Sequence, residues 1–125
     1  MFFLELYGHA APMKSGKQLA IVLVTAPEMK TARKLAKAAL TSRLAACVNL
    51  VPKLESHFWW QGKIDVAAEV LMIFKTSIPR LWLLEQLVLG QHPYDTPEFV
   101  VLPVTAATEL YEEWWRASVR PRPNA

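Results

Sequence analysis

Short apolar runs along the chain predict its strands. Runs rich in aliphatic and β-branched residues are typical of strands buried in a core. They cover 18–26, 44–52 continuing through 55–60, 63–76 and about 98–103. Gln61-Gly62 separates the second run from the third, and this pair is a turn signal of the kind found in β-hairpins. Four strands are therefore expected, with the middle two joined as one long hairpin.

Three segments with apolar residues at helical spacing predict helices. Pro27 favours the start of the first helix, Ser77 is expected to cap the second, and Thr105 or Thr108 begins the last. Gly90 is expected to end the second helix.

The first predicted helix separates its charged side chains from its apolar ones. Its basic residues lie mostly on the face opposite its alanine and leucine positions, which is typical of an amphipathic surface helix. They are Lys30, Arg33, Lys34 and Lys37. We interpret this cluster as a solvated face.

The predicted order is strand, helix, strand, strand, helix, strand, helix. Its first six elements match the split βαβ pattern, so the predicted fold class is α+β: a ferredoxin-like βαββαβ sandwich with an extra C-terminal helix. Right-handed crossovers place the first two helices on one face of an antiparallel sheet. Residues 18–119 form this domain, 1–17 are expected to be a flexible N-terminal extension, and 120–125 a disordered tail.

Both faces of the predicted sheet are apolar. In the first strand Ile21 and Leu23 point one way, while Val22 and Val24 point the other. The face that helices leave open normally alternates to polar residues, and soluble monomers seldom expose an apolar patch beyond a few hundred Å². An oligomer that covers the open face is therefore expected. The C-terminal helix could cover part of it instead, and the hairpin could pair with a neighbour's edge strand.

Composition narrows the class of protein. The 125 residues suit one domain, and 53% of them are hydrophobic. No apolar run reaches the roughly 20 residues that span a membrane, and the start lacks a basic leader, so no signal peptide is expected. The single Cys47 favours a reducing, cytoplasmic setting. The net charge of +3 comes from interspersed acids and bases, so a nucleic acid is not expected as a partner. A membrane is not expected as a partner either, because no apolar run is long enough to span one.

Several motifs carry a family resemblance. They are VTAPE (24–28), RLAACVNLVP (43–52), WWQGKI (59–64), EVLMIFKT (69–76), HPYDTPEFVVLPV (92–104) and YEEWW (111–115). Together, in this order, they resemble the CutA family of divalent-cation tolerance proteins. The resemblance covers about 18–119 and implies a ferredoxin-like protomer in a tight homotrimer. It also implies a role in tolerance to copper and other divalent cations.

The resemblance further implies a copper site, in which two positions differ here. Sites proposed for bacterial relatives use a cysteine late in the first strand and a histidine pair before Pro-Tyr. Val24 stands in the cysteine position and Gln91 in the first histidine position, so only His92 carries over as a metal ligand. Copper favours thiolate or several imidazoles, so these differences weaken the implied site.

His92 and the residues after it form the candidate ligand segment. Pro93 restricts His92 to an extended backbone. A segment with few allowed backbone conformations loses less entropy when its side chains become ordered around a ligand. Two interpretations remain open: a ligand site, or a joint between helix and strand with His92 bonded to nearby backbone. If the segment binds a ligand, we expect it to border a cleft. Asp95 and Glu98 offer oxygen ligands for a hard cation there, and Tyr94 offers a hydroxyl.

Four residues outside that segment complete the prediction. Trp60 is expected to line the cleft, while Trp59 points to the opposite face and is buried at an interface. Lys75 is expected to contact an anion or effector, and Glu69 to form an interfacial salt bridge. Cys47 is interpreted as a buried, inert thiol.

Two functions follow from these expectations. The favoured one is a non-enzymatic homotrimer that binds a divalent metal, such as copper, at clefts between subunits. The alternative is a PII-like trimeric signalling module that binds a small anionic effector through Lys75, Tyr94 and Trp60. Catalysis is not expected, because no nucleophile–base pair is visible and TAPEM after the first strand lacks the glycines of a phosphate-binding loop.

Overall fold

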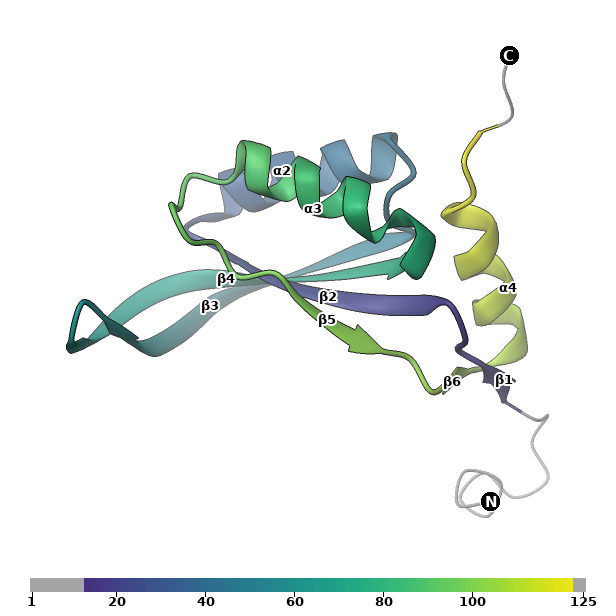
Figure 1. The fold of residues 1–125 in the computed structure, drawn as a ribbon, viewed down its shortest axis with the longest axis horizontal. Helices are drawn as coiled ribbons and strands as arrows, with labels where there is room; N and C mark the ends of the chain where they lie inside the picture. Colours follow the sequence, from purple (N-terminus) through teal and green to yellow (C-terminus); the bar gives the residue numbers. More distant parts are fainter. Residues whose placement is uncertain (1–12, 123–125) are drawn as a thin grey trace.

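A four-stranded antiparallel sheet with two helices on one face forms the centre of the molecule (Figure 1). The computed structural model describes residues 13–122. The sheet order is β3-β4-β2-β5. The strands are β2 (Leu19–Ala26), β3 (Cys47–Trp60), β4 (Lys63–Ser77) and β5 (Val100–Pro103), and the helices are α2 (Met29–Thr41) and α3 (Leu81–Gln91). This arrangement is the ferredoxin-like α+β fold, as predicted.

The face of the sheet under the helices holds the main core. Alternate residues of β2 and β4 point into it, and α2 and α3 contribute small or aliphatic side chains from above. The largest fully buried members are Val22, Val24, Leu35, Met72, Phe74, Leu84 and Val88. Because the small Ala32, Ala36 and Ala39 face the sheet, α2 can pack closely against it.

The second helix ends later than the sequence indicated. A 3-10 turn, η1 (Ile78–Arg80), precedes α3, and Gly90 lies inside the helix rather than at its end. The helix stops at His92, whose backbone is extended (φ −79°, ψ 137°). The physical reason is Pro93, because a residue before proline is disfavoured in the helical region.

The hairpin of β3 and β4 extends beyond the helices (Figure 1). Gln61 and Gly62 both have positive φ, 50° and 79°, between the paired Trp60 and Lys63. Positive φ at both central residues is the type I′ geometry that matches the twist of paired strands. The register of β3 against β4 shifts between Val51 and Leu54. β3 can carry Pro52 there because it is an edge strand, where a missing N–H does not break the sheet.

A second, two-stranded sheet ties the start of the described chain to its end. β1 (Lys14–Ser15) pairs with β6 (Ala106–Ala107), a pairing that the sequence analysis did not predict. Gly16 follows β1, and a Cβ there would lie 2.2 Å from the carbonyl oxygen of Val104, so only glycine fits this close approach. Residues 1–12 and 123–125 of the predicted extension and tail lie outside the described residues.

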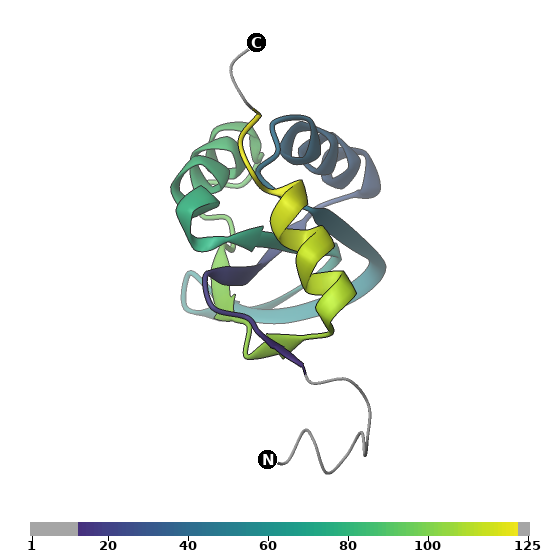
Figure 2. The same ribbon diagram turned by 90° about the vertical axis from the view of Figure 1, so that its right-hand side faces the viewer.

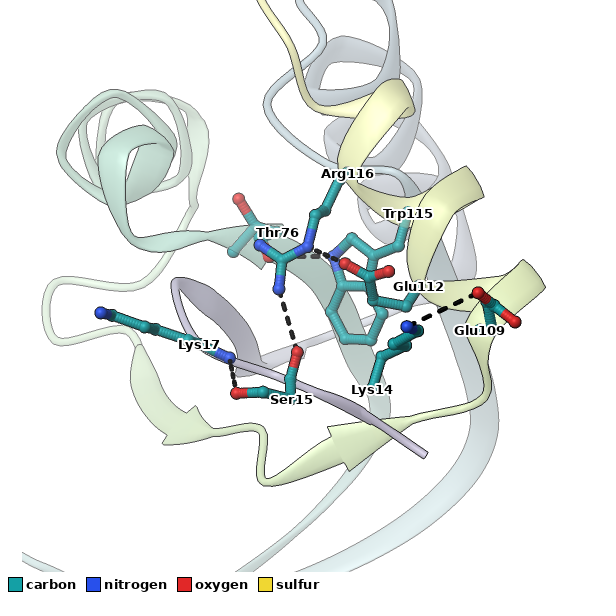
Figure 3. A network of polar contacts seen from close by, with 8 residues as sticks. All are labelled: Lys14, Ser15, Lys17, Thr76, Glu109, Glu112, Trp115 and Arg116. Carbon is teal, nitrogen blue, oxygen red and sulfur yellow. Dashed lines mark hydrogen bonds and ion pairs between the residues drawn. The ribbon is translucent and has the colours of Figure 1, made fainter. Parts of the chain in front are cut away.

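Helix α4 (Glu109–Ser118) crosses the end of the sheet (Figure 2). It begins after Thr108, one of the two predicted starts. Trp115 is buried and donates its indole N–H to the carbonyl oxygen of Thr76, at 2.9 Å. Arg116 bonds to Glu112 and to the carbonyl oxygen of Ser15 (Figure 3). The helix is therefore attached both to the end of β4 and to β1.

The face of the sheet away from α2 and α3 stays largely open. α4 covers only the end near Leu19, where Trp115 and Val119 pack. Beyond that end the face carries apolar side chains that are half-buried or exposed. They are Leu23, Val51, Leu71, Ile73, Val100 and Leu102. The sequence analysis considered two ways to cover this face, an oligomer and the C-terminal helix. Helix α4 covers only a small part of it.

Replacing Trp115 by phenylalanine is expected to lower the free energy of unfolding by about 2 kcal/mol. The change removes the donor to the Thr76 carbonyl and leaves unfilled space beside Leu19. Urea unfolding at one fixed protein concentration, followed by circular dichroism, measures the loss. Trp114→Phe is the matched control: Trp114 is 44% exposed on the same helix, and its change is expected to stay within roughly 0.5 kcal/mol. Equal losses in the two variants would contradict this attachment of α4.

Candidate functional site

An open cleft lies between the β3–β4 hairpin and the segment that follows α3. Its volume is about 900 Å³. The hairpin supplies aromatic and polar side chains on one side, and residues 93–98 supply the other. The candidate residues that line it are Trp60, Tyr94, Asp95 and Glu98, together with Thr25, Ser56, His57, Phe58, Trp59, Asp65 and Glu69. The structure thus brings together four of the predicted cleft residues.

Tyr94 and Glu69 form the central contact of the cleft. The phenol oxygen of Tyr94 donates to Oε2 of Glu69 at 2.7 Å, and Glu69 is only 8% exposed. Burial, and then the hydrogen bond and negative charge of Glu69, raise the pKa of Tyr94 to about 12. At neutral pH the phenol therefore stays protonated and acts as the donor to a buried carboxylate.

His92 is buried beside this pair and uses both ring nitrogens within the chain. Nε2 lies 2.7 Å from the carbonyl oxygen of Thr25, and the backbone N–H of Tyr94 donates to Nδ1 at 3.1 Å. A carbonyl only accepts, so Nε2 donates to Thr25, while Nδ1 accepts from the N–H of Tyr94. With its one lone pair occupied, His92 has no free nitrogen for a metal. This geometry supports the interpretation of His92 as a joint bonded to backbone rather than as a metal ligand.

The cleft concentrates acidic groups. Partial burial, and then the nearby charge of Glu69, raise the pKa of Glu98 above its ordinary value. Asp65 and Asp95 also line the cleft, which gives four carboxylates in all. Among the described residues no lysine or arginine lines it. The local field therefore favours a cation over an anion.

The tip of the hairpin adds aromatic rings. Trp60 lines the cleft as expected, but Trp59 lines it as well, and both are exposed in the single chain. His57 also faces the cleft, with Nε2 at 2.7 Å from Oε2 of Glu55.

Lys75, which was expected to contact an anion or effector, does not line the cleft of the single chain. Its Nζ donates to the hydroxyl of Tyr111 at 2.9 Å and lies 5.3 Å from the centre of that ring. In the sheet it pairs with Ile21 and Cys47, at the end covered by α4. Glu69 lies six residues earlier on β4, which in a strand corresponds to about 20 Å.

The two positions that differ from the copper site implied by the resemblance have unlike surroundings. Val24 is fully buried in the core under the helices, and Gln91 is exposed at the end of α3. Cys47 is half-buried at the start of β3, with Sγ 3.7 Å from Oδ1 of Asn49, rather than fully buried as interpreted. Val24, Gln91 and Cys47 do not line the cleft.

Sequence reasoning assigned Glu69 to an interface and missed its bond with Tyr94. A signal was present, because a carboxylate inside the apolar run EVLMIF requires a partner if it is buried. The partner is 25 residues away along the chain, so the sequence did not identify it.

No set of three histidine, cysteine, aspartate or glutamate side chains within residues 13–122 is arranged to hold a metal ion. The carboxylates of the cleft can still supply part of a coordination shell. A hard divalent cation takes six or more oxygen ligands, from protein and water together. The cleft carboxylates of the described chain alone do not make up such a set of ligands.

The raised pKa of Tyr94 predicts a pH-dependent contribution to stability. Its folded value of about 12 exceeds the ordinary 10.0, so the protonated phenol stabilises the fold fully below pH 10. This contribution is lost as the pH rises from about 10 to about 12. Tyr94→Phe is expected to show a smaller fall in unfolding free energy over that range than the parent. Denaturant unfolding at a series of pH values measures it, and parallel curves would contradict the assignment.

Comparisons with known proteins agree with this fold and its motifs. A family model described as CutA1 divalent ion tolerance protein matches residues 20–118. The divalent-cation tolerance protein CutA of Escherichia coli is 43% identical over 100 residues, which cover 80% of this chain and 89% of that protein. Protein CutA 1, chloroplastic, of Oryza sativa subsp. japonica is 41% identical over 100 residues, and these cover 80% of this chain and 56% of the rice protein.

Solved structures give the same result. The divalent cation tolerance protein of Thermus thermophilus superposes with a TM-score of 0.79 at 39% identity, over 82% of this chain and 99% of that one. CutA from Synechococcus elongatus superposes with a TM-score of 0.83 at 36% identity, over 88% of this chain and 97% of that one. The chain therefore belongs to the CutA1 divalent ion tolerance family.

Proposed function

We propose that this chain serves divalent-cation tolerance by binding a cation in the cleft, through carboxylate oxygens. One observation carries the proposal: Glu69 is buried, and within residues 13–122 no lysine, arginine or histidine forms an ion pair with it. A buried carboxylate without a cation is costly. Tyr94 offsets only part of this cost, and a bound cation would offset the remainder.

The donor set points to a cation that prefers oxygen ligands. Glu69, Asp95 and Glu98 offer carboxylates, which suit hard divalent ions. The sequence analysis expected copper at His92, but both nitrogens of that ring are engaged. Copper is therefore the less supported metal for this cleft.

We further propose that the site is completed between copies of the chain, in the homotrimer that the family resemblance implied. The open face of the sheet exposes Val51, Val100 and Leu102, and the hairpin exposes Trp59 and Ile64. Water contact with so much apolar surface is unfavourable, and packing the open faces together removes it. Neighbouring chains would then approach the cleft and could supply the missing ligands.

The alternative of a small anionic effector has weaker support. It required Lys75 in the cleft, and Lys75 instead contacts Tyr111. Four carboxylates line the cleft, and they repel anions. The proposed activity is binding rather than catalysis, because in the described chain Cys47 lies apart from the cleft and His92 is held as a hydrogen-bonding joint.

Glu69→Gln is expected to weaken the binding of Mn²⁺ at least about tenfold, because it removes the buried charge while keeping the shape of the side chain. Isothermal titration calorimetry of the intact oligomer, first stripped with chelator, measures the affinity. Glu85→Gln, which makes the same charge change on α3 and outside the cleft, is expected to bind like the parent.

Titration with Cu²⁺ separates the two proposed metal sites. If Glu69→Gln leaves Cu²⁺ binding unchanged and His92→Gln abolishes it, then His92 rather than Glu69 is the metal ligand. Parent protein that binds neither Mn²⁺ nor Cu²⁺ would contradict the proposed function.

A charge on the open face is expected to dissociate the trimer. Leu102→Lys places an ammonium group on that face, which costs too much to bury without a partner, whereas Leu40→Lys places it on α2. The two leucines are similarly exposed in the single chain, 40% and 43%. Sedimentation equilibrium is expected to give a mass near three times 14.2 kDa for the parent and for Leu40→Lys, and a lower mass for Leu102→Lys. A monomeric parent would contradict the assembly.

A further inference from the structure

The outer surface of α3 is uncharged and largely apolar, although it faces solvent. Leu84 and Val88 point towards the sheet and are fully buried. At 3.6 residues per turn, the opposite arc consists of Trp82, Leu83, Gln86, Leu89 and Gly90, and all five are exposed. Trp82 is 66% exposed. A surface helix normally carries charges on this arc, so α3 departs from the usual pattern.

The outer surface of α2 has the complementary character. Its buried alanine and leucine residues point towards the sheet. The opposite arc is basic, and its exposed side chains are Lys30, Arg33, Lys34 and Lys37. The acids of these two helices lie elsewhere: Glu28 is at the start of α2, and Glu85 is half-buried on α3.

The two arcs form one surface because α2 and α3 lie side by side on the same face of the sheet (Figures 1 and 2). Each helix buries the arc that faces the sheet, so each exposed arc points away from it. We call this combined surface, made by the outward residues of α2 and α3, the helix-layer face. It places a row of positive charges beside a row of protruding apolar side chains.

We propose that the helix-layer face binds the surface of an anionic lipid bilayer. Basic residues are attracted to anionic headgroups, while a tryptophan and aliphatic side chains beside them enter the boundary between headgroups and acyl chains. Each helix within residues 13–122 is too short or too polar to cross a bilayer, so the contact is with the surface.

Charge and position favour a bilayer over a second copy of the chain. A symmetric contact between two helix-layer faces would bring their lysines and arginines together. The open sheet face, which we assigned to contacts between copies, points the opposite way (Figure 1). An assembly through that face leaves the helix-layer face available.

This inference differs from the interpretation of the sequence alone. That interpretation treated the lysines as a solvated face and expected no membrane partner. The sequence did not identify the outward apolar residues of α3, because a helix with apolar residues on most sides shows little contrast between its faces. The fold places the uncharged arc of α3 beside the basic arc of α2.

Vesicle co-sedimentation of the full chain tests the proposal. Phosphatidylcholine vesicles are compared with vesicles of phosphatidylcholine and phosphatidylglycerol. Binding is expected to the anionic vesicles only and to decrease as salt is raised. Equal binding to both vesicles, or binding to neither, would overturn the proposal.

Matched variants locate the surface. Lys34→Glu with Lys37→Glu, and separately Trp82→Ser, are each expected to weaken partitioning onto anionic vesicles roughly tenfold or more. Lys17→Glu with Lys63→Glu makes the same change in net charge outside the helix layer, and Leu110→Ser removes a leucine that is 80% exposed on α4. These control variants are expected to bind like the parent, provided that circular dichroism and sedimentation show an unchanged fold and assembly.

Fluorescence gives a second measurement that does not depend on weakened variants. Trp82→Phe keeps an apolar ring and is expected to bind like the parent. Brominated acyl chains are expected to quench the parent more than Trp82→Phe, because only the parent carries an indole on this face. Equal quenching would overturn the proposed orientation. Retention on immobilised poly-glutamate tests an acidic polypeptide as the partner instead. If the parent binds poly-glutamate as strongly as vesicles, and Trp82→Ser has no effect on either, the face binds acidic polypeptides and the proposal is overturned.

Discussion

The structure depends on one constraint: a sheet with two apolar faces has helices on only one of them. The main core lies under α2 and α3 and holds the fold together. The other face leaves Ile73, Leu71 and Leu102 in partial contact with water. Since apolar surface of this extent is costly to expose, we propose that this face packs against other copies of the chain. The proposed availability of the helix-layer face and the proposed sharing of the cleft between copies both depend on that packing.

In the cleft, the buried carboxylate of Glu69 is stabilised by a hydrogen bond but has no cationic partner within the described chain. Tyr94 donates one strong hydrogen bond to Glu69, and burial keeps that phenol protonated. His92 holds the segment in place by bridging the carbonyl of Thr25 and the N–H of Tyr94. Two aromatic residues thus fix the wall of the cleft, while the negative charge of Glu69 remains without a cationic partner in the described chain. This division of roles favours cation binding.

The correct predictions concern features that neighbouring residues determine. Short apolar runs indicated the strands, Thr108 was one of two expected starts of the last helix, and Gln61-Gly62 marked the hairpin turn, because each depends on local sequence and geometry. Gly90 was a misleading local signal, since the restriction imposed by Pro93 acts one residue before it and determines where the helix ends. The pairing of β1 with β6 has no periodic signal, because each strand is only two residues long.

By itself the sequence determined the ferredoxin-like order of elements, the two apolar faces, and the placement of Tyr94, Asp95 and Glu98 on a proline-bounded segment. Only the tertiary structure decided that Glu69 is the partner of Tyr94 and that Lys75 faces Tyr111 at the other end of the sheet. The physical reason is distance along the chain. These hydrogen bonds join residues 25 and 36 positions apart. They depend on how strands are registered and helices packed, and periodicity contains no information about either.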